Sequence, residues 1–139
     1  MRKKLQWGFA VLALAAMGGS AYAHHSFAAE YDDKNPLKLT GAITKVDWSN
    51  PHVYFYLDVE DEKGKVTNWS WEMGAPGALR GRGWDKNTLK IGDVVTVEGS
   101  RAKDGGFHGN ARNVVLASTG QTLGAASSQG QDQEKGKGK

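Results

Sequence analysis

Alternation of apolar and polar residues with a period of two constrains the fold of this chain more than any other feature. The clearest case is HVYFYLDVE at residues 52–60, where Val53, Phe55, Leu57 and Val59 share one face. This period is that of a half-buried β-strand. Comparable strand-like stretches occupy residues 37–48, 66–73, 93–102 and 107–117. We therefore expect an all-β domain of five strands.

The segments between these stretches predict how the strands are arranged. The short sequences DEKGK (61–65) and KDGG (103–106) favour hairpin turns. Residues 74–93 are rich in glycine, and Pro76 to Arg80 can form one short helical turn. A three-stranded meander, a helical connector and a final hairpin follow the order of a small OB-like Greek-key barrel. Another small barrel or a sandwich is the alternative, and a bulge or bend is expected at Gly41.

The first 23 residues have the composition of a secretory signal peptide. Cations at residues 2–4 precede an apolar run at 9–17, and Ala21-Tyr22-Ala23 is a typical cleavage site. The apolar run is too short to span a bilayer, which needs about 20 residues. We expect cleavage after Ala23, a periplasmic protein without a membrane anchor, and a mature chain that begins at His24.

Loss of this peptide would change the charge of the protein. The whole chain carries 18 basic and 15 acidic residues, for a net charge of +3, and three of the basic residues lie at positions 2–4. The mature chain would therefore be neutral, 15 against 15. Since nucleic-acid binding depends on a cationic surface, we expect no nucleic-acid partner. The chain has no cysteine and so cannot form a disulfide.

Composition divides the rest of the chain into three parts. Residues 24–36 form a polar leader, residues 37–119 the barrel domain, and residues 120–139 a polar tail. The tail has no periodic apolar residues, so we expect it to be disordered.

Five stretches together make the sequence similar to a known family. They are HHSFAAEYD (24–32), VDWSNPH (46–52), NWSWE (68–72), LRGRGW (79–84) and LKIGDVVTVEG (89–99). Through them the chain resembles the small exported bacterial proteins of domain of unknown function 6152. The resemblance implies a small exported β domain, and because the family has no established activity it assigns no residue a role. The sequence STGQTL and His108 depart from the family pattern.

The histidines suggest a metal site. His24 at a mature amino terminus would offer its α-amine and its ring nitrogen together, and His25 could add a third nitrogen donor. Copper(II) prefers such nitrogen ligands, so copper is the expected metal, with His52 completing the site. This requires the leader to fold back, anchored by the aromatic pair Phe27 and Tyr31. The alternative is that the amino terminus is frayed and that His52 belongs to an ordinary turn.

Aromatic residues support a second hypothesis. Tyr54 and Tyr56 are expected on the outer face of the second strand, where OB-like barrels often bind ligands. A metal-free module that binds a small molecule or a periplasmic protein through them is therefore the alternative function. The other interpretation is that these tyrosines only brace the sheet surface.

The remaining candidates point to ordinary structure. His108 is expected to be an exposed histidine of the last hairpin, and Glu72 a surface carboxylate. No nucleophile motif, phosphate-binding loop or dinucleotide fingerprint is present, and RGRGW (80–84) is interpreted as a connector. The sequence thus favours a binding module over an enzyme.

Overall fold

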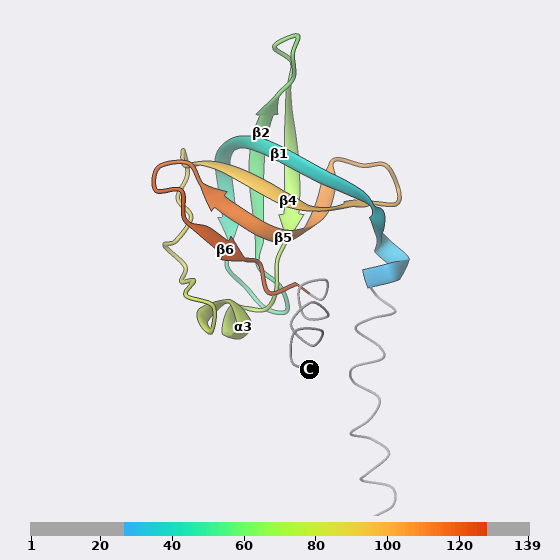
Figure 1. The fold of residues 1–139 in the computed structure, drawn as a ribbon. Helices are drawn as coiled ribbons and strands as arrows, with labels where there is room; N and C mark the ends of the chain where they lie inside the picture. Colours follow the sequence, from blue (N-terminus) through green and yellow to red (C-terminus); the bar gives the residue numbers. More distant parts are fainter. Residues whose placement is uncertain (1–26, 128–139) are drawn as a thin grey trace, which may run out of the picture.

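The computed structural model describes residues 27–127, in which six strands form one sheet and a short helix joins two of them (Figure 1). Residues 27–30 are helical and lead directly into the first strand. The elements are β1 (Tyr31–Asp47), β2 (Tyr54–Glu60), β3 (Val66–Glu72), α3 (Pro76–Arg80), β4 (Val94–Ala102), β5 (His108–Leu116) and β6 (Thr122–Gly124).

The sheet closes on itself into a barrel-like ring. The strand order is β3-β2-β1-β4-β5-β6, and an additional parallel pairing joins β3 to β5. The other pairings are antiparallel. The predicted all-β class, with an OB-like order and one helical connector at Pro76–Arg80, is confirmed.

The long strand β1 takes part in both halves of the ring. Its first half pairs with β4 and its second half with β2, and Ala42 is the residue where the two ladders meet. Gly41 lies at this crossing, where a Cβ atom would come within 2.3 Å of the Asp58 carbonyl oxygen. The bulge expected at Gly41 lies further along, because the register with β2 shifts between Ile43 and Lys45. Gly41 therefore serves close packing of two strands.

The core fills the inside of the ring as the alternation predicts. Val53, Phe55 and Leu57 of the second strand segment are fully buried. On β3 the inward residues are Trp69 and Trp71, followed by Met73. Burial of each large apolar side chain contributes about 1.5–3 kcal/mol, so these neighbouring strands hold much of the stabilising surface.

Both predicted ends of the domain are corrected by the structure. β1 begins at Tyr31, six residues before the expected start at Leu37, so part of the predicted leader belongs to the sheet. At the other end, β6 lies inside the predicted tail and pairs with β5. Leu123 is buried, and the Gly124 carbonyl accepts a 3.0 Å hydrogen bond from Nε1 of Trp84. A strand of three residues is too short to display a period, which is why the alternation did not predict it.

Candidate functional site

The most unusual polar group on the ring is the carboxylate of Glu72, at the end of β3. Its neighbours Trp71 and Met73 are buried inside, so Glu72 points outward. Its side chain is nevertheless only 14% exposed. Glu72 therefore lies on the outer face, where it was expected, but it is more enclosed than an ordinary surface carboxylate.

Three side chains donate hydrogen bonds to this carboxylate. The Tyr54 hydroxyl lies 2.6 Å from Oε2, and the Tyr31 hydroxyl lies 3.2 Å from the same atom. Nδ2 of Asn110 lies 3.3 Å from Oε1, and Nδ1 of His52 lies 3.6 Å from it. We call Glu72, Tyr31, Tyr54, Asn110 and His52 the Glu72 cluster.

Strand pairing brings these residues together from distant parts of the chain. Glu72 lies opposite Tyr54 in the β2–β3 ladder and opposite Asn110 in the parallel β3–β5 ladder. Tyr31, at the start of β1, reaches the same carboxylate from a fourth strand. The cluster therefore exists only because β3 and β5 close the ring, a non-local pairing that alternation along the sequence does not specify.

The cluster keeps both tyrosines protonated. Burial raises the pKa of the Tyr31 hydroxyl, and the negative charge of Glu72 raises it further. Burial also raises the pKa of Tyr54, followed by its hydrogen bond to Glu72 and the charge of that carboxylate. Both hydroxyls thus act as donors at neutral pH, since an ionised tyrosine beside a carboxylate is strongly disfavoured.

His52 sits at the open side of the cluster. Its side chain is 46% exposed, and its Nδ1 faces Glu72 at a distance longer than a normal hydrogen bond. Because Nδ1 faces the carboxylate, Nε2 is the ring nitrogen left to contact a ligand. This pairing of a carboxylate and a histidine is the arrangement that orients metal-binding imidazoles in proteins.

Asn110 contributes an acceptor that the protein does not use. Its side chain is 1% exposed, and within residues 27–127 its Oδ1 has no hydrogen-bond partner. A buried carbonyl without a donor costs about 1–3 kcal/mol. The cluster therefore provides three hydrogen-bond donors to Glu72, but the Oδ1 atom of Asn110 has no donor of its own within residues 27–127.

His108 lies near the cluster but is held by a different carboxylate. Its Nε2 is 2.9 and 3.0 Å from the two oxygens of Asp104, and its side chain is partly exposed as expected of a hairpin residue. The pKa of Asp104 is lowered by the backbone amide of Gly106 and then by His108. The His108 ring also makes an edge contact with Tyr31, with centroids 6.4 Å apart.

The other predicted site residues are distributed as follows. His24 and His25 lie outside the described residues. Phe27, the first described residue, packs its ring 5.6 Å from that of Tyr31, which is the aromatic pair expected to anchor the leader. Tyr54 belongs to the Glu72 cluster, whereas Tyr56 lies beneath the ammonium group of Lys45, 5.1 Å from its ring centroid.

Two features of residues 27–127 bear on metal binding and on membrane attachment. No group of three or more histidine, aspartate or glutamate side chains between residues 27 and 127 is placed to hold a metal ion, so His52 and Glu72 stand there as a pair. Over the same range no helix is long and apolar enough to cross a membrane.

Comparison with known protein families gives one match. A family of unknown function, DUF6152, matches residues 11–112, well over half of the chain. The chain belongs to the DUF6152 family. A comparison with curated proteins finds no match. The DUF6152 match ends before β6 and includes every residue of the Glu72 cluster.

Membership of DUF6152 confirms the resemblance and leaves the activity open. Three of the stretches that carried the resemblance end at or pass through the cluster, contributing Tyr31, His52 and Glu72. Sequence reasoning singled out His52 and Tyr54 as site residues and Tyr31 only as an anchor of the leader, and it missed Asn110. The available signal was the OB-like strand order, because its β3–β5 closure sets the end of the third strand beside the fifth.

Proposed function

We propose that this protein is an exported, periplasmic binding module that takes up copper(II) at its mature amino terminus. The ligands are the α-amine and imidazole of His24, a nitrogen of His25 and Nε2 of His52. The observation that carries the proposal is the contact of Tyr31 with Glu72, because it brings the start of the described chain to the carboxylate that faces His52.

Chain length supports this grouping. His24 lies three positions before Phe27 in the sequence, and three residue steps extend at most about 11 Å. The Phe27 ring packs on Tyr31, whose hydroxyl is bound to Glu72. A free amino terminus at His24 would therefore start within about 11 Å of Phe27, whose ring packs on a residue of the Glu72 cluster.

The chemistry of the donors favours copper over other divalent cations. An α-amine with a pKa near 8 and neutral imidazoles are nitrogen donors, and copper(II) heads the affinity order for such ligands. Glu72 already accepts three hydrogen bonds, so its role is to orient His52 rather than to bind the metal.

Export is part of the same proposal. It rests on the cations at 2–4, the apolar run at 9–17 and the site at 21–23, which together form a signal peptide. Cleavage after residue 23 is what would free the His24 amine, so the copper proposal depends on correct processing.

The alternative function is recognition of a small molecule or a protein without metal. It is favoured by Tyr56, which is half-buried on the outer side of β2 next to Lys45. The Tyr54 hydroxyl is engaged by Glu72, so such a surface would rely more on Tyr56 than on Tyr54.

Calorimetric titration with copper(II) tests the proposal. Protein purified from the periplasm, with its amino terminus verified by mass spectrometry, is compared with a form that carries one extra alanine before His24. We expect one copper per chain, bound at least a hundredfold more weakly by the extended form. An affinity no tighter than that of a free His-His peptide, or equal affinities of the two forms, would contradict copper binding at this end. Sensitivity to Tyr56→Ala but not to the extension would support the alternative.

A further inference from the structure

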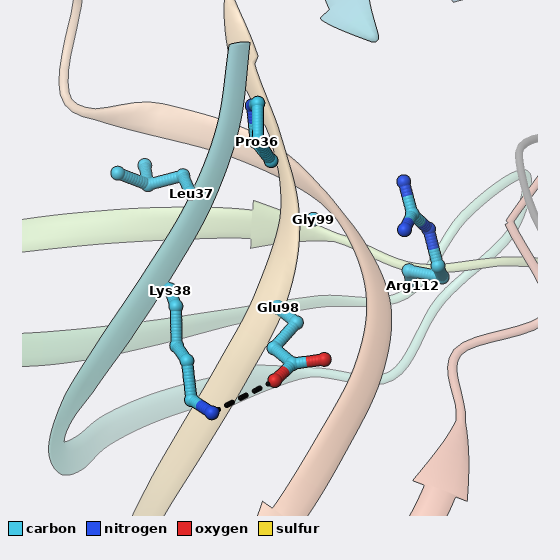
Figure 2. Close-up of a pocket in the computed structure, with 6 residues that line it drawn as sticks. All are labelled: Pro36, Leu37, Lys38, Glu98, Gly99 and Arg112. Carbon is cyan, nitrogen blue, oxygen red and sulfur yellow. Dashed lines mark ion pairs between the residues drawn. The ribbon is translucent and has the colours of Figure 1, made fainter. Parts of the chain in front are cut away.

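A second polar site lies on strands β1, β4 and β5, and none of the residues that line it belongs to the Glu72 cluster. A pocket of about 310 Å³ is lined by Pro36, Leu37, Lys38, Glu98, Gly99 and Arg112 (Figure 2). We refer to it as the Arg112 pocket. Its volume is at the small end of the range for small-molecule sites, about 300–1,000 Å³.

Two irregularities of the sheet form this pocket. In the β4–β5 ladder Glu98 pairs with Asn113 and Gly99 with Ala111, so Arg112 is the extra residue of a β-bulge. In the β1–β4 ladder the register shifts between Asp32 and Pro36. Bulges re-aim side chains and are common next to binding sites, and here the bulged residue is an arginine that lines the pocket.

The guanidinium group of Arg112 is incompletely satisfied. Its Nε is buried and has no hydrogen-bond partner within residues 27–127. A buried donor of this kind is costly without a partner, and a charged donor more so. In the view of Figure 2, Arg112 stands apart from Lys38 and Glu98, which point toward each other.

The charges of the lining favour an anion. Nζ of Lys38 lies 3.0 Å from Oε1 of Glu98, so these two charges compensate each other. Arg112 is left as the uncompensated charge of the lining, two cations against one anion. Guanidinium groups bind carboxylates through paired N–H donors, and Arg112 carries the one charge of the lining that no other lining residue compensates.

The apolar residues of the lining indicate that the bound anion also has an apolar group. Pro36 and Leu37 are the apolar side chains of the lining, and Leu37 also packs against the core. Gly99 lets β4 approach β5 closely behind the pocket, since a Cβ there would come within 2.0 Å of the Asn110 carbonyl oxygen. We infer that the Arg112 pocket binds a small organic monocarboxylate, its carboxylate on Arg112 and its short apolar body against Pro36 and Leu37.

The test uses benzoate as the probe and nuclear magnetic resonance as the readout. Titration of the ¹⁵N-labelled protein follows the Nε–Hε signal of Arg112 and the amide signal of Gly99. Benzoate should shift both signals saturably, at the roughly millimolar affinity of a ligand of this size. Two matched probes separate the contribution of the negative charge from that of the apolar ring. Benzamide has the same ring without a charge, and inorganic phosphate has a charge without an apolar group. Each should bind at least tenfold more weakly.

Variants assign the effect to Arg112. Arg112→Gln should abolish the saturable shifts of Gly99, and Arg112→Lys should retain weak binding because the charge remains but the paired donors are lost. Arg80→Gln, an exposed arginine of α3, should bind benzoate as the wild type does. Non-saturating shifts, equal binding of benzamide or phosphate, or full binding by Arg112→Gln would each overturn the inference. The probe comparison on the wild-type protein holds even if a variant fails to fold.

Discussion

The Glu72 cluster and the Arg112 pocket are both polar sites on a small barrel-like ring, but their charged groups are satisfied in opposite ways. Glu72 is nearly enclosed and accepts hydrogen bonds from Tyr31, Tyr54 and Asn110. Arg112 lies beside a hollow, and its buried Nε has no partner in the described part of the chain. The first arrangement ties strands together, whereas the second leaves a donor for a ligand.

This difference predicts that substitutions in the Glu72 cluster affect mainly stability, whereas substitutions in the Arg112 pocket affect mainly binding. Removing a group whose partners are buried leaves those partners unsatisfied, so the fold weakens. Removing a group that has no partner costs the fold little and instead affects what can bind. The Glu72 cluster combines both aspects, because its interior ties four strands together while His52 at its rim is open to a ligand.

The largest effect is expected from Glu72→Ala. The substitution leaves the hydroxyls of Tyr31 and Tyr54 and the amide of Asn110 without their acceptor, so the free energy of unfolding should fall by about 3 kcal/mol. Urea denaturation monitored by tryptophan fluorescence measures it. Glu98→Ala is the matched control, since Glu98 forms an exposed pair with Lys38, and the loss of this pair should cost less than about 1 kcal/mol. Equal losses of stability for the two substitutions would mean that the hydrogen bonds to Glu72 stabilise the fold no more than an exposed ion pair does.

An intermediate effect is expected at alkaline pH. Because the pKa of Tyr31 and of Tyr54 is raised in the folded state, both residues bind their protons more tightly there than in the unfolded chain. Their stabilising contribution is complete below the ordinary tyrosine pKa of about 10 and is lost as the pH rises above it. The wild type should therefore lose stability more steeply above pH 10 than the double variant Tyr31→Phe, Tyr54→Phe. The measurement is the melting temperature of both proteins between pH 8 and 11. If the two melting temperatures fell in parallel with rising pH, the two tyrosines would not be coupled to Glu72.

The smallest effect is expected from Arg112→Gln. Its Nε makes no hydrogen bond within residues 27–127, so the free energy of unfolding should fall by no more than about 0.5 kcal/mol, and removal of the unsatisfied donor favours a rise. The same urea titration measures this change. A loss approaching that of Glu72→Ala would mean that Arg112 is a structural residue and that the contrast between the two sites is wrong.

Local patterns predicted the strands well but predicted the sites poorly. Phe55 and Trp71 are buried as the alternation requires, and α3 occupies the expected Pro76–Arg80. β6 was not predicted, because three residues are too few to show an alternating pattern. Its place in the sheet depends on pairing with β5 and on the hydrogen bond from Trp84. A strand pattern alone assigns Glu72 to the outer face, and only the ring closure shows that this face is covered there.

The bulge at Arg112 could not be predicted for a related reason. A bulge is a mismatch between two strands, so it appears only when the partner register is known. His52 is different, because its exposure at a strand end followed from the sequence, while its neighbour Glu72 did not. The interpretation of His24 and His25 still rests on the sequence and on the short reach from Phe27.

The central claim is that the amino terminus and His52 bind one copper ion together beside Glu72. Electron paramagnetic resonance of the one-to-one copper(II) complex tests this by counting the coordinating nitrogens in the wild type and in His52→Ala. His108→Ala is the matched control, because the Nε2 of His108 is held by Asp104. We expect His52→Ala to remove one nitrogen and His108→Ala to leave the spectrum unchanged. A wild-type spectrum identical to that of a free His-His peptide, and unaltered by His52→Ala, would contradict the claim.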